Sequence, residues 1–161
     1  MRYTQLTIGR TFGIALDHGE EFFAQLTAFC TEHDIRAGYL PMFLGAFRTV
    51  HLVGTCEHID DPEGPVWSAA EYHHVEILGS GTIAWNEETQ QVAPHVHVAV
   101  GERDHAAAGK TSHLLSGSVQ FVNELYLVEI LQPAMTRPKL GAYEMPTLQF
   151  GQPDAGHETN G

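Results

Sequence analysis

Two histidines separated by one residue are the feature of this sequence best suited to chemistry. His95 and His97 flank Val96 in the run PHVHVAV, residues 94–100. If this run is a β-strand, residues i and i+2 point to the same face, and one metal ion can bridge both imidazoles. Histidine is the commonest metal ligand in proteins. The alternative is a pair of surface histidines on the wet face of a half-buried strand, and the pair alone favours neither.

A third ligand would turn the pair into a typical metal site. A catalytic zinc usually takes three protein ligands and keeps one position for water. His113, in the segment KTSHLLSG, follows a glycine-containing connection that could bring it back over the sheet, and it is the best third candidate. His105, within that connection, is a weaker one. Imidazoles suit zinc, copper, iron and nickel alike, so the spacing does not identify the metal.

The other histidines have simpler explanations. His73 and His74 are adjacent, so on a strand they face opposite sides and cannot chelate one ion together. His51, on an expected strand, is interpreted as a hydrogen-bonded, partly buried side chain.

Carboxylates near the pair could assist a metal. Glu102 follows the His-x-His strand, and Glu124 and Glu129 lie on a later one. The odd spacing of Glu124 and Glu129 places them on opposite faces, so they are no natural acid/base pair, and a solvated strand face explains each. Glu124 is the candidate acid/base or outer partner of a metal. No nucleophile can be named, so no reaction is assigned, although a metal-dependent activity is possible.

The charge balance excludes whole classes of partner. The 161 residues hold 8 Lys and Arg against 20 Asp and Glu, a net charge of −12. Binding to the phosphate backbone needs clustered basic residues, so this balance opposes nucleic acid as a nonspecific partner, and it equally opposes anionic membranes. The length and the 43% hydrophobic content suit one globular domain.

The N-terminal sequence and the cysteines predict a cytoplasmic protein. The first twenty residues lack the apolar core of a signal peptide, and no apolar run is long enough to span a bilayer. Cys30 and Cys56 form no CxxC pair, which favours two reduced thiols.

One helix and several strands must position these residues. Residues 19–33 carry an apolar stripe at helical spacing, which indicates a helix packed on a sheet. Residues 10–17, 35–40, 46–54, 75–85, 92–100 and 118–131 favour strands. Val96, Val98 and Val100 would supply the buried face of the His-x-His strand. Hairpins are expected at Gly79-Ser80-Gly81 and at residues 86–91.

This order predicts an α+β fold, a mostly antiparallel sheet packed with one main helix. We expect a single domain over residues 1–150. Residues 151–161 are polar and glycine-rich, and we expect a disordered C-terminal tail.

Several segments, in order, resemble the PPC (or PCC) domain, the plants and prokaryotes conserved domain. Gly19-Glu20-Glu21 opens the helix, and Leu44-Gly45-Ala46-Phe47 resembles the family's Gly-Ala segment. Val75-Glu76-Ile77-Leu78 with Gly81-Thr82-Ile83 resembles its E-I-L-S-x-x-G-x-I stretch. Pro94-His95-Val96-His97-Val98 resembles its H-x-H-V strand, and His113-Leu114-Leu115-Ser116-Gly117 its G-G-H-L-x-x-G segment. The likeness covers roughly residues 10–150.

The resemblance implies an α+β domain that assembles as a homotrimer. In stand-alone prokaryotic members it also implies a metal, usually zinc, on three histidines that correspond to His95, His97 and His113. The function it suggests is a metal-binding protein that binds or acts on a small-molecule ligand. The alternative is a DNA-binding, transcription-associated protein, as in the plant relatives that carry AT-hooks.

Some positions depart from the family. Thr111 and Ser112 stand where the family has two glycines before the third histidine. The AT-hook core is absent, and Arg137-Pro138-Lys139, with two basic residues, is no substitute. The His-x-His segment also fits part of the first cupin motif, but Thr89 stands where that motif needs glycine, and the second cupin motif is missing.

Overall fold

The structure is a computed structural model that describes residues 1–55, 67–102, 105–140 and 145–151. Its long elements are one helix and five strands, and four strands of two residues follow near the C-terminus. In chain order they are β1 (Thr7–Asp17), α1 (Phe22–Glu32), β2 (Gly38–Thr55), β3 (Trp67–Asn86), β4 (Gln91–Glu102), β5 (His105–Gln132), β6 (Met135–Thr136), β7 (Lys139–Leu140), β8 (Met145–Pro146) and β9 (Gln149–Phe150).

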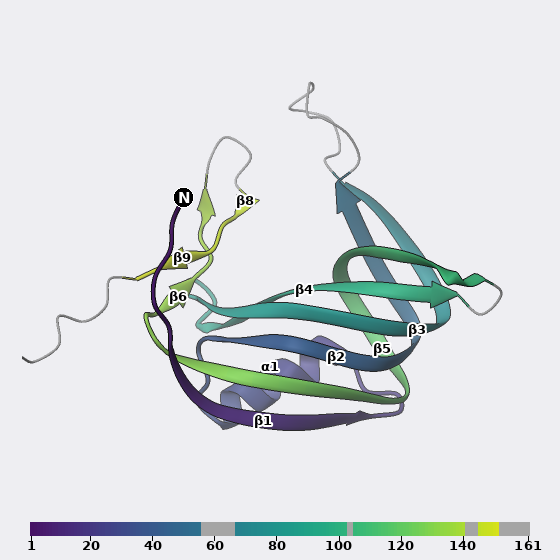
Figure 1. Cartoon of the computed structure of the whole chain (residues 1–161), viewed down its shortest axis with the longest axis horizontal. Coiled ribbons are helices and arrows are strands. Elements are labelled where there is room, and N and C mark those ends of the chain that lie inside the picture. Colours follow the sequence, from purple (N-terminus) through teal and green to yellow (C-terminus); the bar gives the residue numbers. More distant parts are fainter. Residues whose placement is uncertain (56–66, 103–104, 141–144, 152–161) are drawn as a thin grey trace, which may run out of the picture.

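The sheet closes on itself. It runs in the order β1-β5-β2-β3, and β4 joins β3 to the first part of β5, so that β2, β3, β4 and β5 form a ring (Figure 1). These pairings are all antiparallel, whereas β6 joins β3 in parallel. The prediction of an α+β fold with one main helix is wrong, because the chain is mostly strand, one closed antiparallel barrel with a single short helix.

Irregularities in the long strands explain the closure. β5 pairs with β4 over residues 105–113, with β2 over residues 113–129 and with β1 over residues 122–132. Its register against β2 shifts several times, and Phe121 takes a positive φ of 67° at one of these shifts. Such bulges bend a strand and increase its twist. One strand can therefore leave β4, cross β2 and finish beside β1.

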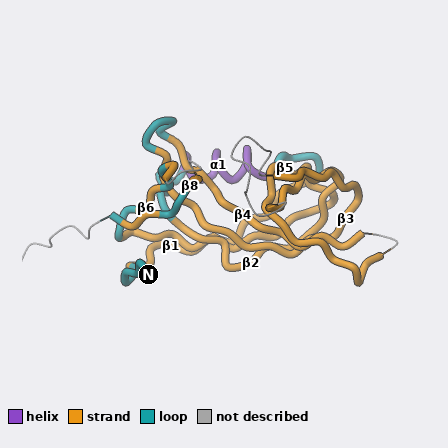
Figure 2. Tube along the Cα trace, turned by 90° about the horizontal axis from the view of Figure 1, so that it is seen from above, coloured by secondary structure: helices purple, strands orange, loops and turns teal. Residues whose placement is uncertain are grey.

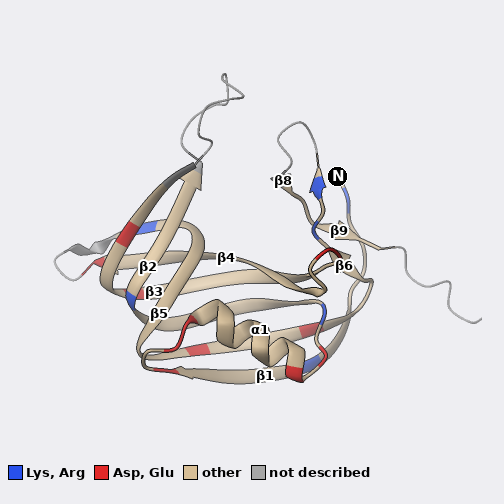
Figure 3. Ribbon diagram, turned by 180° about the vertical axis from the view of Figure 1, so that it is seen from behind, with Lys and Arg blue, Asp and Glu red and all other residues tan. Residues whose placement is uncertain are grey.

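The helix covers one face of the sheet and closes the core (Figures 2 and 3). It spans Phe22–Glu32, inside the predicted range 19–33, and Glu21 caps its start by accepting the Ala24 N–H at 2.7 Å. The Phe22 ring packs on those of Phe43 and Phe47 in β2, with centroids 4.9 and 5.8 Å apart. On the facing strand β4, the valines at positions 96, 98 and 100 are buried as predicted.

One of the two expected hairpins forms. The turn between β3 and β4 lies between the paired residues Asn86 and Gln91, as predicted. The hairpin expected at Gly79–Gly81 is wrong, because these residues continue β3. A Cβ on Gly79 would collide with the Phe43 ring, and one on Gly81 would lie 2.7 Å from the His95 carbonyl oxygen. These glycines therefore allow close packing within the sheet rather than a turn.

Parts of the earlier predictions lie outside the described residues. The tail expected over 151–161 is described only at Gly151, and Cys56 falls in the gap between residues 55 and 67. Cys30 is a free, buried thiol, and burial raises its pKa to about 11.

Among the described residues, no helix is long and apolar enough to cross a membrane.

A buried carboxylate fixes the edge strand. Glu129 of β5, 6% exposed, accepts the Nε and Nη2 groups of Arg10 in β1, each at 2.8 Å, and the Arg10 backbone N–H at 3.0 Å. The same Nη2 donates to the carbonyl of His33, directly after α1. A solvated strand face, the sequence interpretation of Glu129, is therefore wrong. Arg10 holds the pKa of Glu129 down at about 2, mainly through these hydrogen bonds.

This pair predicts an acid-sensitive stability. Because the folded pKa of Glu129 lies below its ordinary value, its carboxylate stabilises the fold above about pH 4.5, and this contribution is lost as the pH falls toward 2. In chemical unfolding, Glu129→Gln should be less stable than the wild type at pH 6, and the difference should shrink at pH 3. The exposed turn residue Glu87 gives the control Glu87→Gln. An equal difference at both pH values would contradict the prediction.

Candidate metal centre

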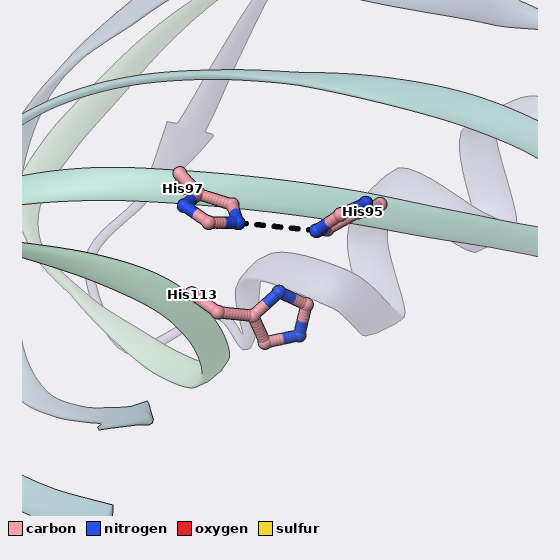
Figure 4. Close-up of side chains that lie close together, drawn as sticks. All are labelled: His95, His97 and His113. Atoms are coloured by element: carbon pink, nitrogen blue, oxygen red, sulfur yellow. Dashed lines mark hydrogen bonds between the residues drawn. The ribbon is translucent and has the colours of Figure 1, made fainter. Parts of the chain in front are cut away.

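Three histidines from two neighbouring strands converge on one spot (Figure 4). His95 and His97 lie on β4, two residues apart, so they share a face, while the valine between them is buried on the other. His113 lies on β5 directly opposite His97 in the β4–β5 register. Residues directly opposite in an antiparallel pair have neighbouring side chains, so the register completes the cluster.

The spacing of the ring nitrogens suits one metal ion. One nitrogen from each ring lies within 4.8 Å of the others, and Nε2 of His95 is 3.1 Å from Nε2 of His97. Two nitrogens bound tetrahedrally to zinc at about 2.0–2.1 Å lie about 3.3 Å apart. The donor set therefore fits a zinc-like ion with only small side-chain movements, and it leaves a position for water or a ligand.

The surroundings of His95 and His113 favour their neutral forms. Burial lowers the pKa of His95 to about 4, with further lowering from the nearby charge of Arg137 and from the two other rings. Burial also lowers the pKa of His113, helped by His97 and Arg137. A metal binds the neutral imidazole, so these environments favour the binding form at neutral pH.

Arg137 is a neighbour of the cluster that the sequence did not suggest. Its Nη1 lies 3.1 Å from Nδ1 of His95, and its Nη2 donates to Oγ1 of Thr82 at 2.6 Å. Thr82 is the β3 residue paired with His95, so its position follows from the register. In the sequence, Arg137 drew attention only because Arg137-Pro138-Lys139 is too weakly basic to replace an AT-hook. No local pattern connects Arg137 with His95, which lies 42 residues away.

The remaining candidates lie elsewhere. Glu124 is exposed on β5, paired with Leu44 of β2, and is not part of the three-histidine cluster. Glu102 faces Lys110, with the charged atoms 3.8 Å apart. His105 begins β5, but its side chain is not among those that the structure describes.

Three other histidines of the sheet, His51, His73 and His74, contact neighbouring side chains. His51 contacts Oγ of Ser116 at 2.8 Å and a Glu71 carboxylate oxygen at 2.5 Å, and His73 contacts the other oxygen at 2.8 Å. The interpretation of His51 as hydrogen-bonded and partly buried is confirmed. The nitrogens of His74 and of its neighbour His73 have separate partners, Gln120 and Glu71.

Solved structures share this fold at low sequence identity. A plant- and prokaryote-conserved protein from Pyrococcus horikoshii matches with a TM-score of 0.77 and 20% identity, over 92% of this chain and 97% of its own. A metal-containing protein from Archaeoglobus fulgidus matches with 0.78 and 20%, over 92% and 99%. A suggested DNA-binding protein from Bacteroides thetaiotaomicron matches with 0.72 and 21%, over 91% and 99%.

The family assignment comes from the sequence itself. No curated protein matches the sequence. The model of the Plants and Prokaryotes Conserved (PCC) domain matches residues 3–131, most of the chain, and confirms the resemblance. This chain therefore belongs to the Plants and Prokaryotes Conserved domain family.

Proposed function

We propose that this protein is a zinc-binding protein whose site is formed by His95, His97 and His113, and that the metal holds a small ligand. The observation that carries the proposal is the convergence of three ring nitrogens within 4.8 Å. The low pKa of His95 and the metal-containing relative with the same fold support it. Bound zinc would supply a Lewis acid and an open coordination position. His95, His97 and His113 would hold it and leave the fourth position free.

Elemental analysis tests the proposal directly. Protein expressed without a histidine tag should contain close to one zinc per chain, and chelator-treated protein should take up one equivalent of zinc in a titration. Competition with cobalt, nickel and copper then identifies the preferred ion, because imidazole ligands alone do not. A chain that neither retains nor rebinds any of these metals would contradict the proposal.

The proposal includes assembly as a homotrimer, the state that the family resemblance implies. Apolar side chains on the outer face of the sheet support self-association, since the paired residues Leu44 and Leu78 are 40% and 57% exposed. Light scattering should give three times the mass of one chain, and Leu78→Glu should lower this mass. A wild-type protein that is monomeric at micromolar concentration would rule out the trimer. The cytoplasmic location remains a prediction.

DNA binding is the second candidate, favoured by relatives of the same fold that are described as suggested DNA-binding proteins. The charge opposes it. Arg10 lies on β1, Arg48 on β2 and Lys110 on β5, whereas Arg137 and Lys139 lie two residues apart near the C-terminus, so the described basic residues form no continuous stripe (Figure 3). An anisotropy titration of a labelled duplex at low salt decides this, and we expect no binding at micromolar protein.

A further inference from the structure

Arg137 is a cation beside the three-histidine cluster, on the Nδ1 side of the His95 ring, in a chain with a net charge of −12. It follows β6, beyond the residues 3–131 that match the family model, so the family motifs do not include it. Two of its nitrogens contact His95 and Thr82, and its Nε is buried with no partner among the described residues. A guanidinium carries five N–H donors, so donors remain for a ligand.

The hydrogen bond from Arg137 to His95 would be lost if Nε2 of His95 bound a metal. A guanidinium only donates, so Nδ1 of His95 accepts here, and the ring proton of neutral His95 lies on Nε2, toward His97. When Nε2 serves a metal site, that proton belongs on Nδ1, which then no longer accepts from Arg137. The Nη1 group is thereby available to another acceptor beside the three histidines.

An apolar groove includes Thr82, the residue that Arg137 contacts. It encloses about 380 Å³ and is lined by Tyr39, Leu40, Met135, Leu148 and Phe150, with Ser80 and Thr82 of β3 at its edge. Thr82 also accepts the hydrogen bond from Arg137, and Ser80 and Thr82 are the register partners of His97 and His95. Thr82 therefore links the groove to the guanidinium, and the β3–β4 register places the histidine cluster on the next strand.

We propose that Arg137 and this groove bind a small monocarboxylic acid with an apolar body. The carboxylate lies between Arg137 and the three-histidine site, and the apolar part occupies the groove. A guanidinium fork matches the two oxygens of one carboxylate, and the apolar walls favour an unsubstituted chain or ring over a sugar or a nucleotide. This inference rests on the proposed metal site for one of the two contacts of the carboxylate, whereas the contact with Arg137 stands without it.

Calorimetric titrations with acetate, butyrate and hexanoate test the inference, on both zinc-loaded and metal-free protein. Each added methylene should raise the affinity by roughly three- to fourfold, so that hexanoate binds about a hundredfold more tightly than acetate. Hexylamine, with the same chain and the opposite charge, should bind at least about tenfold more weakly than hexanoate.

Variants separate the two parts of the subsite. Arg137→Gln should weaken hexanoate binding at least about tenfold and leave zinc stoichiometry unchanged, whereas Lys139→Gln, two residues away and exposed, should change neither. Leu148→Ser should reduce the gain per methylene while acetate binding is retained.

The failures of the two proposals differ. Zinc binding with no hexanoate binding, or with equal binding by Arg137→Gln, overturns the carboxylate subsite alone. If metal-free wild type binds hexanoate and metal-free Arg137→Gln does not, the subsite is supported even if the protein binds no metal. Absence of hexanoate binding in both forms overturns it.

Discussion

Replacing His97 with alanine is expected to remove tight zinc binding. His97 adjoins both other ligands, since it faces His113 across the β4–β5 pair and its Nε2 lies 3.1 Å from that of His95. Loss of an outer partner of a metal ligand already costs about 10–100-fold in affinity, so loss of a ligand should cost at least about a hundredfold. Competition with a chromophoric chelator measures this change.

The stability of the variant distinguishes a lost ligand from a damaged fold. His97 is exposed, so metal-free His97→Ala should unfold within about 0.5 kcal/mol of the metal-free wild type. Zinc should raise the Tm of the wild type and not that of the variant, because a ligand stabilises only the state that binds it.

The matched control is His73→Ala, on the neighbouring strand β3. This histidine is also exposed, and its ring is bound to Glu71. We expect its zinc affinity to be unchanged. Equal zinc loss in both variants, or zinc retained by His97→Ala, would show that the three-histidine cluster is not the metal site.

The sequence predicted the contents of the cluster better than its surroundings. Strand periodicity is local, so the shared face of His95 and His97 and the buried face of Val96, Val98 and Val100 follow from the pattern alone. His113 joins the cluster through the pairing of β4 with β5, which the sequence did not predict. The residue itself was suggested by the glycine-containing connection before it and implied by the family resemblance. Arg137 and Thr82 are placed by contacts between β3 and the segment after β6, and no short-range pattern encodes such contacts.

The sequence predicted most of the helix and strand positions, but not the closure of the sheet into a barrel. The apolar stripe correctly marked the helix of the described residues, but the prediction of an α+β fold, a mostly antiparallel sheet packed with one main helix, did not include closure of the sheet. Closure depends on one strand of 28 residues that changes partners, which no periodicity shows. Gly79 and Gly81 of β3 were predicted to form a turn, but they allow close packing within the sheet. The prediction failed because turns and close packing both favour glycine.

Gly45→Ala is expected to be the most damaging single-methyl change in the sheet. Gly45 adopts a φ of +150°, where side chains are strained, and it pairs with Asn123 in the β2–β5 register. A Cβ there would collide with the Asn123 side-chain oxygen and the Val122 carbonyl, and would lie 2.8 Å from the Asn123 Cα. Asn123 is fully buried, and Val122 offers backbone, so neither can move aside cheaply.

We therefore expect Gly45→Ala to lose about 2–4 kcal/mol of stability from backbone strain and overpacking, and to lower the Tm by about 5–15 °C. The comparison needs metal-free protein at equal concentration, since zinc binding and assembly both raise the Tm. Gly13→Ala in β1 is the matched control, because nothing lies within 4 Å of its added Cβ and its φ is not positive. Its stability should change by less than about 1 kcal/mol, with a small gain from the restricted unfolded chain. Equal Tm values for the two variants would mean that the bulge at Gly45 relaxes freely, and that the curvature which brings β5 back to β4, and His113 to His97, does not depend on it.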